Sequence, residues 1–225
     1  MRHSKNDFVF RNFYFFESLG STQDFAIDLI SKSNILEPSV IICDIQSGGR
    51  GRKGSAWASP KGGIWMSIIF EPNLKINQLF FNVIITSLLL CSIIKSYINK
   101  SVQIKWPNDI LVNKKKIAGI LMDAQIQNEN IKKIILGVGV NANNDIEETT
   151  YQIRLSNSTN YEITTIKHER LGISINETEL VAKFLYGLSD YYLKLKEVSF
   201  RNEILSKYKR MIEESSKNQQ YTFTS

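Results

Sequence analysis

A short segment rich in glycine and basic residues is the part of the sequence best suited to bind an anion. Residues 46–57 contain four glycines, and Arg50, Arg52 and Lys53 place three cationic side chains within four positions. Glycine lets the backbone approach a ligand closely and exposes N–H groups, while arginine and lysine supply positive potential for phosphate or carboxylate. Trp57 adds a flat face on which a purine or an apolar ring can stack. We interpret the segment as a candidate binding loop.

Two well-known phosphate-binding motifs do not account for this loop. Its spacing Gly49-x-Gly51-x-x-Gly54 matches the dinucleotide fingerprint, but that fingerprint must open a helix. Here the chain continues through Pro60 and two glycines into a run typical of a strand, and no Gly-Lys-Ser/Thr closes a P-loop. A mobile, basic surface loop is the alternative interpretation of the segment taken alone.

A second group of chemically capable residues is the run Lys-Trp-Pro-Asn-Asp at residues 105–109. Pro107 cannot continue a helix and marks a turn between two strands. Lys105 then lies at a strand end, where a scaffold can hold its ammonium group against a phosphoryl or acyl oxygen. A solvated lysine beside a structural turn is the alternative.

Gly137 and Gly139 alternate within an apolar run that ends at Asn141. Glycine weakens a strand, so something needs the room that the missing side chains leave. Either a ligand or another part of the protein must lie close, and binding and packing account for the pattern equally well.

The elements that must position these residues can be read from hydrophobic periodicity. Strands are predicted at residues 8–16, 40–45, 64–70, 102–106, 109–112, 117–125 and 131–140, with a hairpin turn at 113–114. Helices are predicted from 21–22 onwards, at 76–98, from a capping-box-like 176–179 to about 195, and at 200–214. Residues 141–161 are predicted to be polar surface. This order predicts an α+β fold with a mixed, largely antiparallel sheet and helices.

The longest apolar run has two interpretations. Residues 76–94 carry no charge over 19 positions, a length suited to a membrane span. Asn77, Asn82 and Thr86 interrupt the run, however, and a helix buried under a sheet has the same composition. We favour the buried helix and expect no membrane association.

Composition limits the number of domains and the class of protein that this sequence can form. The 225 residues suit one domain, and a hydrophobic content of 43% is enough for a core, which argues against global disorder. The net charge of +6 suits an anionic partner, but much of it is diffuse lysine. Two cysteines, Cys43 and Cys91, make neither a disulfide framework nor a zinc pattern, and the N-terminus lacks the apolar core of a signal peptide. We expect a cytoplasmic protein.

Taken together, these segments resemble the biotin–protein ligases (biotin–[acetyl-CoA-carboxylase] ligases). The resemblance runs from about Phe13 to Glu214 and is carried by residues 17–23, 46–63, 105–109, 116–121 and 137–141. Their order and separation make the match highly specific. It implies a class II synthetase-like biotin/lipoyl ligase catalytic domain at residues 1–198, with a helix and the remnant of a truncated C-terminal domain at 199–225.

The resemblance also implies a reaction and its residues. Biotin would be activated with ATP to biotinoyl-5′-adenylate and then transferred to a lysine of a biotin carboxyl carrier protein, with Mg²⁺ on the phosphates and its protein ligands unknown. Lys105 and Arg52 are the expected catalytic residues, Gln46 would meet the ureido ring and Trp57 the adenine. The expected binding set is Ser21, Thr22, Gln23, Gln46, Arg50, Gly51, Arg52, Trp57, Lys105, Gly119, Gly137, Gly139 and Asn141.

Further expectations concern partners and rival functions. A homodimer is expected by resemblance, and no DNA-binding domain, because the first motif begins by residue 17. A lipoate–protein ligase or octanoyltransferase is the nearest rival, although those relatives lack the Arg-Gly-Arg loop and the Lys-Trp-Pro-Asn-Asp run. A non-catalytic, basic nucleic-acid-binding relative is the second rival, weakly supported by the lysines at 114–116.

Overall fold

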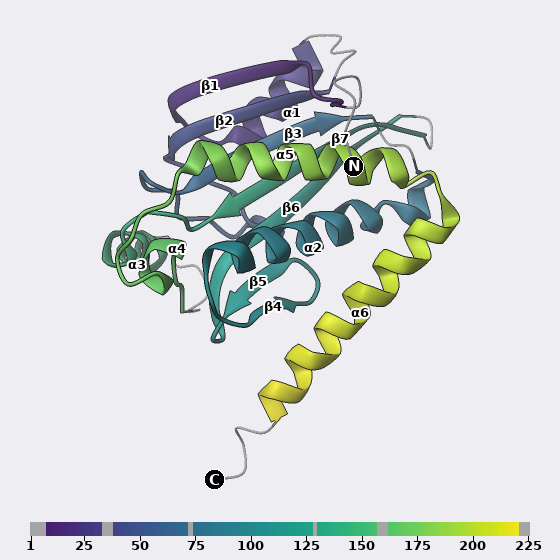
Figure 1. The fold of residues 1–225 in the computed structure, drawn as a ribbon. Helices are drawn as coiled ribbons and strands as arrows, with labels where there is room; N and C mark the ends of the chain where they lie inside the picture. Colours follow the sequence, from purple (N-terminus) through teal and green to yellow (C-terminus); the bar gives the residue numbers. More distant parts are fainter. Residues whose placement is uncertain (1–7, 33–37, 72–73, 128–129, 157–161, 221–225) are drawn as a thin grey trace.

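Seven strands form one sheet at the centre of the fold. The computed structural model describes residues 8–32, 38–71, 74–127, 130–156 and 162–220. The strands are β1 (Asn12–Leu19), β2 (Ser39–Gln46), β3 (Ile64–Phe70), β4 (Val102–Lys105), β5 (Asp109–Val112), β6 (Lys115–Gln127) and β7 (Asn130–Val140). Their order across the sheet is β1-β2-β3-β7-β6-β5-β4 (Figure 1). Only β1 and β2 pair in parallel, which confirms the mixed, largely antiparallel sheet.

Helices cover both faces of this sheet. They are α1 (Thr22–Lys32), α2 (Phe80–Tyr97), α3 (Ile146–Leu155), α4 (Ile166–Glu169), α5 (Glu177–Lys194) and α6 (Val198–Gln220). Figure 1 shows α2 and α5 side by side across the near face, with α1 behind the sheet. The larger apolar cluster lies on the α2 and α5 side and a smaller one lies under α1. The result is an α+β fold, as predicted.

Strand β7 shows how alternation divides the two faces. Leu136 and Val138 belong to the larger cluster, whereas Ile135 belongs to the cluster under α1. Successive side chains of a strand point to opposite faces, so Gly137 and Gly139 lie on the α1 face. That face therefore has a stretch without side chains, where a cavity can form.

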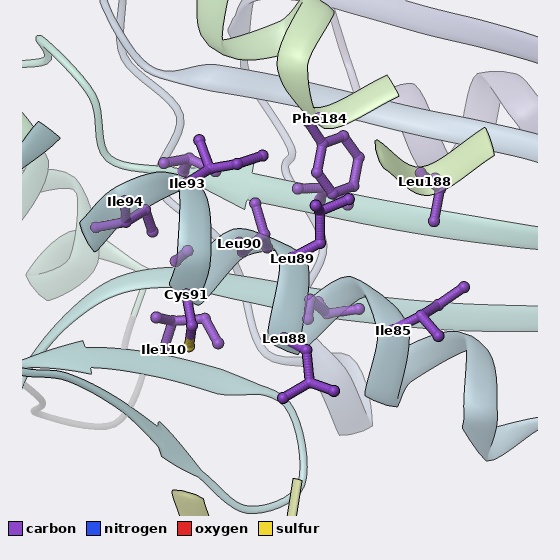
Figure 2. Packing of buried hydrophobic residues seen from close by; sticks show 14 of the residues in the cluster. Ile85, Leu88, Leu89, Leu90, Cys91, Ile93, Ile94, Ile110, Phe184 and Leu188 are labelled. Atoms are coloured by element: carbon purple, nitrogen blue, oxygen red, sulfur yellow. The ribbon is translucent and has the colours of Figure 1, made fainter. Parts of the chain in front are cut away.

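Helix α2 is the core helix of the domain. Segment Ile76–Tyr97 is long and apolar enough to cross a membrane by length and composition, yet 67% of its most apolar 18-residue stretch is buried inside the fold. In Figure 2, Leu89 lies beneath Phe184 of α5, and Cys91 lies beside Ile110. The Oγ1 of Thr86 donates to the Asn82 carbonyl at 2.7 Å, which satisfies a buried hydroxyl within the helix. The buried-helix interpretation is confirmed.

Two local signals in the sequence lead to correct predictions. Asn176 accepts a hydrogen bond from the Glu179 N–H at 3.1 Å and opens α5. Asn113 and Lys114 have φ of 49° and 66°, the positive values that a tight hairpin turn between β5 and β6 needs.

Other boundaries differ from the prediction. The first strand begins at Asn12 rather than at residue 8, because Phe10 turns into the core and the Val9 N–H donates to Ser189 Oγ of α5. The stretch predicted as polar surface contains α3, whose N-cap Asp145 accepts from the Glu148 N–H. Residues 157–161 of that stretch lie outside the described residues.

The last helix belongs to the same core as the rest of the domain. Ile204 and Tyr208 of α6 are buried in the larger cluster, and α6 packs against β4 and α2. It extends to Gln220, beyond the predicted end at 214. The boundary between residues 198 and 199 stays a prediction, and residues 221–225 lie outside the described part.

Candidate active site

Two glycines on neighbouring strands form a flat floor on the α1 face. Gly119 of β6 pairs directly with Gly139 of β7. A Cβ on either glycine would lie 2.6 Å from the ring of Trp57, so both positions are left bare for that indole. On the same face, a Cβ at Gly137 would lie 2.7 Å from Gln23 Oε1. The glycines of β6 and β7 are thus explained by close packing inside a site.

A cavity of about 650 Å³ lies above this floor. All but one of the predicted binding residues line it, although they come from segments far apart in the sequence. The lining includes Ser21, Thr22, Gln23, Gln46, Arg50, Gly51, Arg52, Trp57, Lys105, Gly119, Gly137 and Gly139. Asn141 is the exception: it is buried beyond the end of β7, where its amide group bonds Lys116 O and Asn144. At this position Asn141 stabilises the neighbouring backbone and does not line the cavity.

A connected set of neutral side chains forms one part of the wall. Gln46 Oε1 accepts from the Thr22 N–H at 2.8 Å, and Gln46 Nε2 donates to Ser59 Oγ at 2.7 Å. Ser67 Oγ donates to Gln23 Oε1 at 2.8 Å and lies 2.9 Å from Thr22 Oγ1. Because each amide is held at both its oxygen and its nitrogen, the groups that face the cavity are fixed in place. This part of the wall suits an uncharged polar ligand group.

The basic loop is folded back on itself and attached to the start of α1. Three backbone hydrogen bonds hold it. The main-chain N–H of Trp57 donates to Gly49 O at 2.8 Å, that of Gly51 to Ser55 O at 2.7 Å, and that of Gly48 to Gly20 O at 2.7 Å. These bonds keep the loop over the cavity. The loop is therefore an ordered part of the wall, which argues against the unstructured-surface alternative.

Positive charge dominates the lining. Six cationic side chains and two carboxylates line the cavity: Arg50, Arg52, Lys53, Lys105, Lys114 and Lys116 against Asp109 and Glu162. Arg50 and Lys116 are seen in ion pairs. Arg50 lies 2.8 Å from Asp24 and 3.7 Å from Asp123, and Lys116 Nζ lies 2.9 Å from Asp109 Oδ1.

Arg52 and Lys105, the two predicted catalytic residues, differ from these. Neither forms an ion pair with any carboxylate in the described part of the chain, so their charges are available to a ligand. Arg50, in contrast, is held by carboxylates of α1 and β6. The structure therefore distinguishes Arg50, which is paired, from Arg52, the arginine that the resemblance marks as catalytic.

Lys116 is a site residue that sequence reasoning misses. It opens the segment 116–121 that contributes to the family resemblance, but the pattern gives it no role of its own. Its Nζ lies 4.7 Å from the centre of the Trp57 ring, in cation–π contact. Burial lowers the pKa of Lys116 below 10.5, and the charges of Arg52 and Lys105 lower it further, while Asp109 opposes them. Arg52 and Lys105 are thus close enough to Lys116 to disfavour its charged form.

Two buried polar atoms of residues that line the cavity, Trp57 Nε1 and Asn108 Oδ1, lack a hydrogen-bond partner within the described part of the chain. Trp57 Nε1 forms no hydrogen bond with any of the described residues, although it is buried. Such an atom is costly to leave unpaired, and a ligand acceptor in the cavity would satisfy it. Among the described residues, no three of His, Cys, Asp and Glu gather in a metal-binding group.

Comparison with known proteins identifies the family. The model of the biotin/lipoate A/B protein ligase family matches residues 15–141. The chain belongs to this family. The matched segment contains the glycine floor, the basic loop and Lys105, so the family resemblance and the cavity coincide.

Curated relatives agree with this assignment. The bifunctional ligase/repressor BirA of Bacillus subtilis is 32% identical over 140 residues, 62% of this chain and 43% of the relative. Biotin–protein ligase 1, chloroplastic, of Arabidopsis thaliana is 30% identical over 189 residues, 80% of this chain and 50% of the relative. The chain thus spans half the length or less of these two relatives.

Among solved structures, the biotin protein ligase from Aquifex aeolicus in complex with biotin and ATP superimposes with a TM-score of 0.69 at 26% identity. The match covers 88% of this chain and 77% of that one. The shared fold confirms the class II synthetase-like architecture of this family.

Proposed function

We propose that this chain activates biotin with ATP to biotinoyl-5′-adenylate and transfers biotin to a lysine of a biotin carboxyl carrier protein. The single observation that carries the proposal is the cavity, in which a fixed set of neutral amides and hydroxyls adjoins the unpaired cations Arg52 and Lys105. Neutral donors and acceptors suit a ureido ring, and unpaired cations suit a carboxylate and a phosphate. The biotin and ATP bound by the Aquifex aeolicus ligase supply both chemistries.

The first step joins two anions, which is why fixed cations are needed. A carboxylate oxygen of biotin attacks the α-phosphorus, the bond to the β-phosphate oxygen breaks, and pyrophosphate leaves. Lys105 and Arg52 hold the carboxylate and the α-phosphoryl oxygens together and neutralise the negative charge that develops there. Mg²⁺ bound to the phosphates would add positive charge to the departing pyrophosphate.

In the second step the acceptor amine attacks the acyl carbon of the adenylate, and AMP leaves. The order of the basic loop over the cavity supports a role in excluding water from this labile intermediate. Trp57, lying flat on the glycine floor with its Nε1 unpaired, is the proposed contact for the adenine. The proposal places a homodimeric ligase in the cytoplasm, where the two free, buried cysteines would stay reduced.

The test is to incubate the full chain with ATP, Mg²⁺ and either biotin or lipoate and to look for the acyl-adenylate by mass. Biotin should give adenylate, and Lys105→Ala should slow its formation by about 10²–10³-fold, the usual cost of losing one group that stabilises developing charge. Lys196→Ala is the matched control, because that lysine is exposed and does not line the cavity.

Other results would contradict the proposal. If lipoate gave an adenylate and biotin gave none, the lipoate ligase alternative would be favoured. Salt-dependent binding to random DNA without any adenylate would favour the nucleic-acid-binding alternative. A Lys105→Ala variant that formed adenylate at the wild-type rate would remove that lysine from the mechanism.

A further inference from the structure

The turn between β4 and β5 carries a tryptophan that is mostly exposed. Trp106 lines the cavity, and it is 66% exposed to solvent. Within the described part of the chain, no residue forms a ring contact or a hydrogen bond with its side chain. The other two tryptophans are packed, Trp65 in the core and Trp57 against the glycine floor. Covering so large an apolar surface is favourable, so an indole left open beside a cavity indicates a binding surface.

The turn that carries Trp106 is fixed in place by its neighbours. β4 and β5 pair directly on either side of it. Tyr208 Oη of α6 donates to Pro107 O at 2.6 Å, and Asn108 Nδ2 donates to Ile120 O of β6 at 2.5 Å. Because the backbone of the turn is already ordered, a partner that covers the indole loses little conformational entropy in doing so.

The charges around the opening of the cavity indicate what kind of partner fits there. Four exposed cations line the same cavity: Arg52, Lys53, Lys105 and Lys114. The two carboxylates of the lining each lie in an ion pair with a lysine. The opening is therefore positively charged, and it favours a partner with an acidic surface.

We propose that Trp106 is a contact for the acceptor protein. Its indole packs against an apolar side chain next to the lysine that receives biotin, and the surrounding cations bind an acidic face of the same protein. This inference rests on the proposed ligase function and deepens it. The acceptor lysine must enter the cavity to reach the adenylate, so the residues beside that lysine pass the opening where Trp106 is exposed.

The expected role of Trp106 is in binding the acceptor and not in the chemical steps. Tryptophan is enriched among the residues that supply most of the affinity of protein interfaces. A contact that is made equally before and during the attack changes the KM for the acceptor and leaves kcat unaltered. Small nucleophiles, which do not reach the opening of the cavity while they react, should not respond to this residue at all.

The test compares attack by the acceptor protein with attack by a small amine. The full chain is loaded with biotin and ATP, desalted, and mixed with either an unmodified biotin carboxyl carrier domain or hydroxylamine. In both reactions the amine nitrogen attacks the acyl carbon and AMP leaves. Trp106→Ala should raise the half-saturating concentration of the carrier domain about tenfold, with the maximal transfer rate and the rate with hydroxylamine within about twofold of wild type.

Two further variants and a salt series complete the experiment. Trp106→Phe keeps an aromatic ring and should retain most of the affinity for the carrier domain. Tyr151→Ala, which removes a comparably exposed ring on α3 outside the cavity lining, should behave as wild type. Raising the salt concentration from about 50 to about 300 mM should raise the half-saturating carrier concentration of the wild-type chain and leave the hydroxylamine rate unchanged.

Several results would overturn the proposal. An equal loss of rate with the carrier domain and with hydroxylamine would mean that Trp106 contacts the adenylate instead. A Trp106→Ala variant that transfers biotin to the carrier domain as wild type does would remove the residue from acceptor binding, and a carrier affinity independent of salt would remove the acidic face. In these cases adenylate formation from biotin would still stand. A chain that forms no adenylate would contradict the proposed function first and this inference with it.

Discussion

At the scale of single residues, the glycines of the site provide space for the indole. Gly119 and Gly139 lie opposite each other on adjacent strands, and the Trp57 ring rests on both. Lys116 covers that ring at 4.7 Å. The ring thus contacts both bare backbone and a cation, so the position of Trp57 depends on residues that need not touch a ligand.

We predict that Gly139→Ala disrupts this arrangement. The new Cβ would lie 2.6 Å from Trp57 Cε2, so the indole must move, at a cost of about 1–3 kcal/mol for overpacking. Urea unfolding measures the stability loss, and adenylate formation should fall with it. Gly20→Ala is the control, since no atom lies within 4 Å of a Cβ there and both properties should be unchanged. An unchanged Gly139→Ala protein would mean that the ring can relax freely.

The residue types in the sequence predicted which chemical groups the site contains better than which side chains pair with one another. The glycines and the unpaired cations Arg52 and Lys105 lie where the motifs placed them. The ion pairs of Arg50 and the burial of Lys116 could not be predicted, because both depend on side chains brought from α1, β5 and β6 by the fold. Asn141 bonds Lys116 O and Asn144 and does not line the cavity, so its role in binding stays a prediction.

At the scale of elements, long periodic segments were predictable and short polar ones were not. The apolar runs of β3 and α2 were easy to predict from the sequence, since elements buried on both sides have few polar positions. Helix α3 escaped prediction because its buried residues, Thr149 and Ile153, are too few to give a clear period. α4 is a single turn, held by contacts distant in sequence.

Those contacts give a pH-dependent prediction for α4. Glu169 is 8% exposed and accepts from Lys100 Nζ at 2.6 Å and Thr164 Oγ1 at 2.5 Å. Burial alone would raise the pKa of Glu169, but these hydrogen bonds and the Lys100 charge outweigh it and hold the pKa below 4.5. The stabilisation is therefore present above pH 4.5 and is lost as the pH falls through the lowered pKa.

We expect Glu169→Gln to lose about 1–2 kcal/mol of unfolding free energy at neutral pH, because a charge-assisted bond is removed. The difference from wild type should shrink as urea unfolding is repeated at progressively lower pH below 4.5. Asp28→Asn, which breaks an exposed pair with Lys32 on α1, should stay within about 0.5 kcal/mol. A difference independent of pH would contradict the role of the Glu169 charge.

At the scale of the whole molecule, one core joins the two ends of the described chain. Phe10 near the start and Tyr208 in α6 are both buried in the cluster around α2. Tyr208 Oη donates to Pro107 O at 2.6 Å, two residues from Lys105. Helix α6 therefore supports the turn that positions the proposed catalytic lysine.

Tyr208→Phe should accordingly cost about 1 kcal/mol, because the carbonyl of Pro107 loses its donor while the ring still fills the core. Unfolding in urea should stay a single transition, with α6 and the sheet lost together. Tyr186→Phe, at a 66% exposed position on α5, is the control and should change little. An early, separate transition in the wild-type protein would show that α6 is an independent unit.

The Trp57 indole on the glycine floor also allows the site to be followed by tryptophan fluorescence. The chain has three tryptophans. Trp65 is sealed in the protein with its Nε1 bonded to Pro60 O, and Trp106 is 66% exposed. Trp57 alone combines a buried, unpaired Nε1 with a cation over its ring. A ligand that reaches this nitrogen would alter the emission of Trp57, so occupancy of the cavity could be followed without a label.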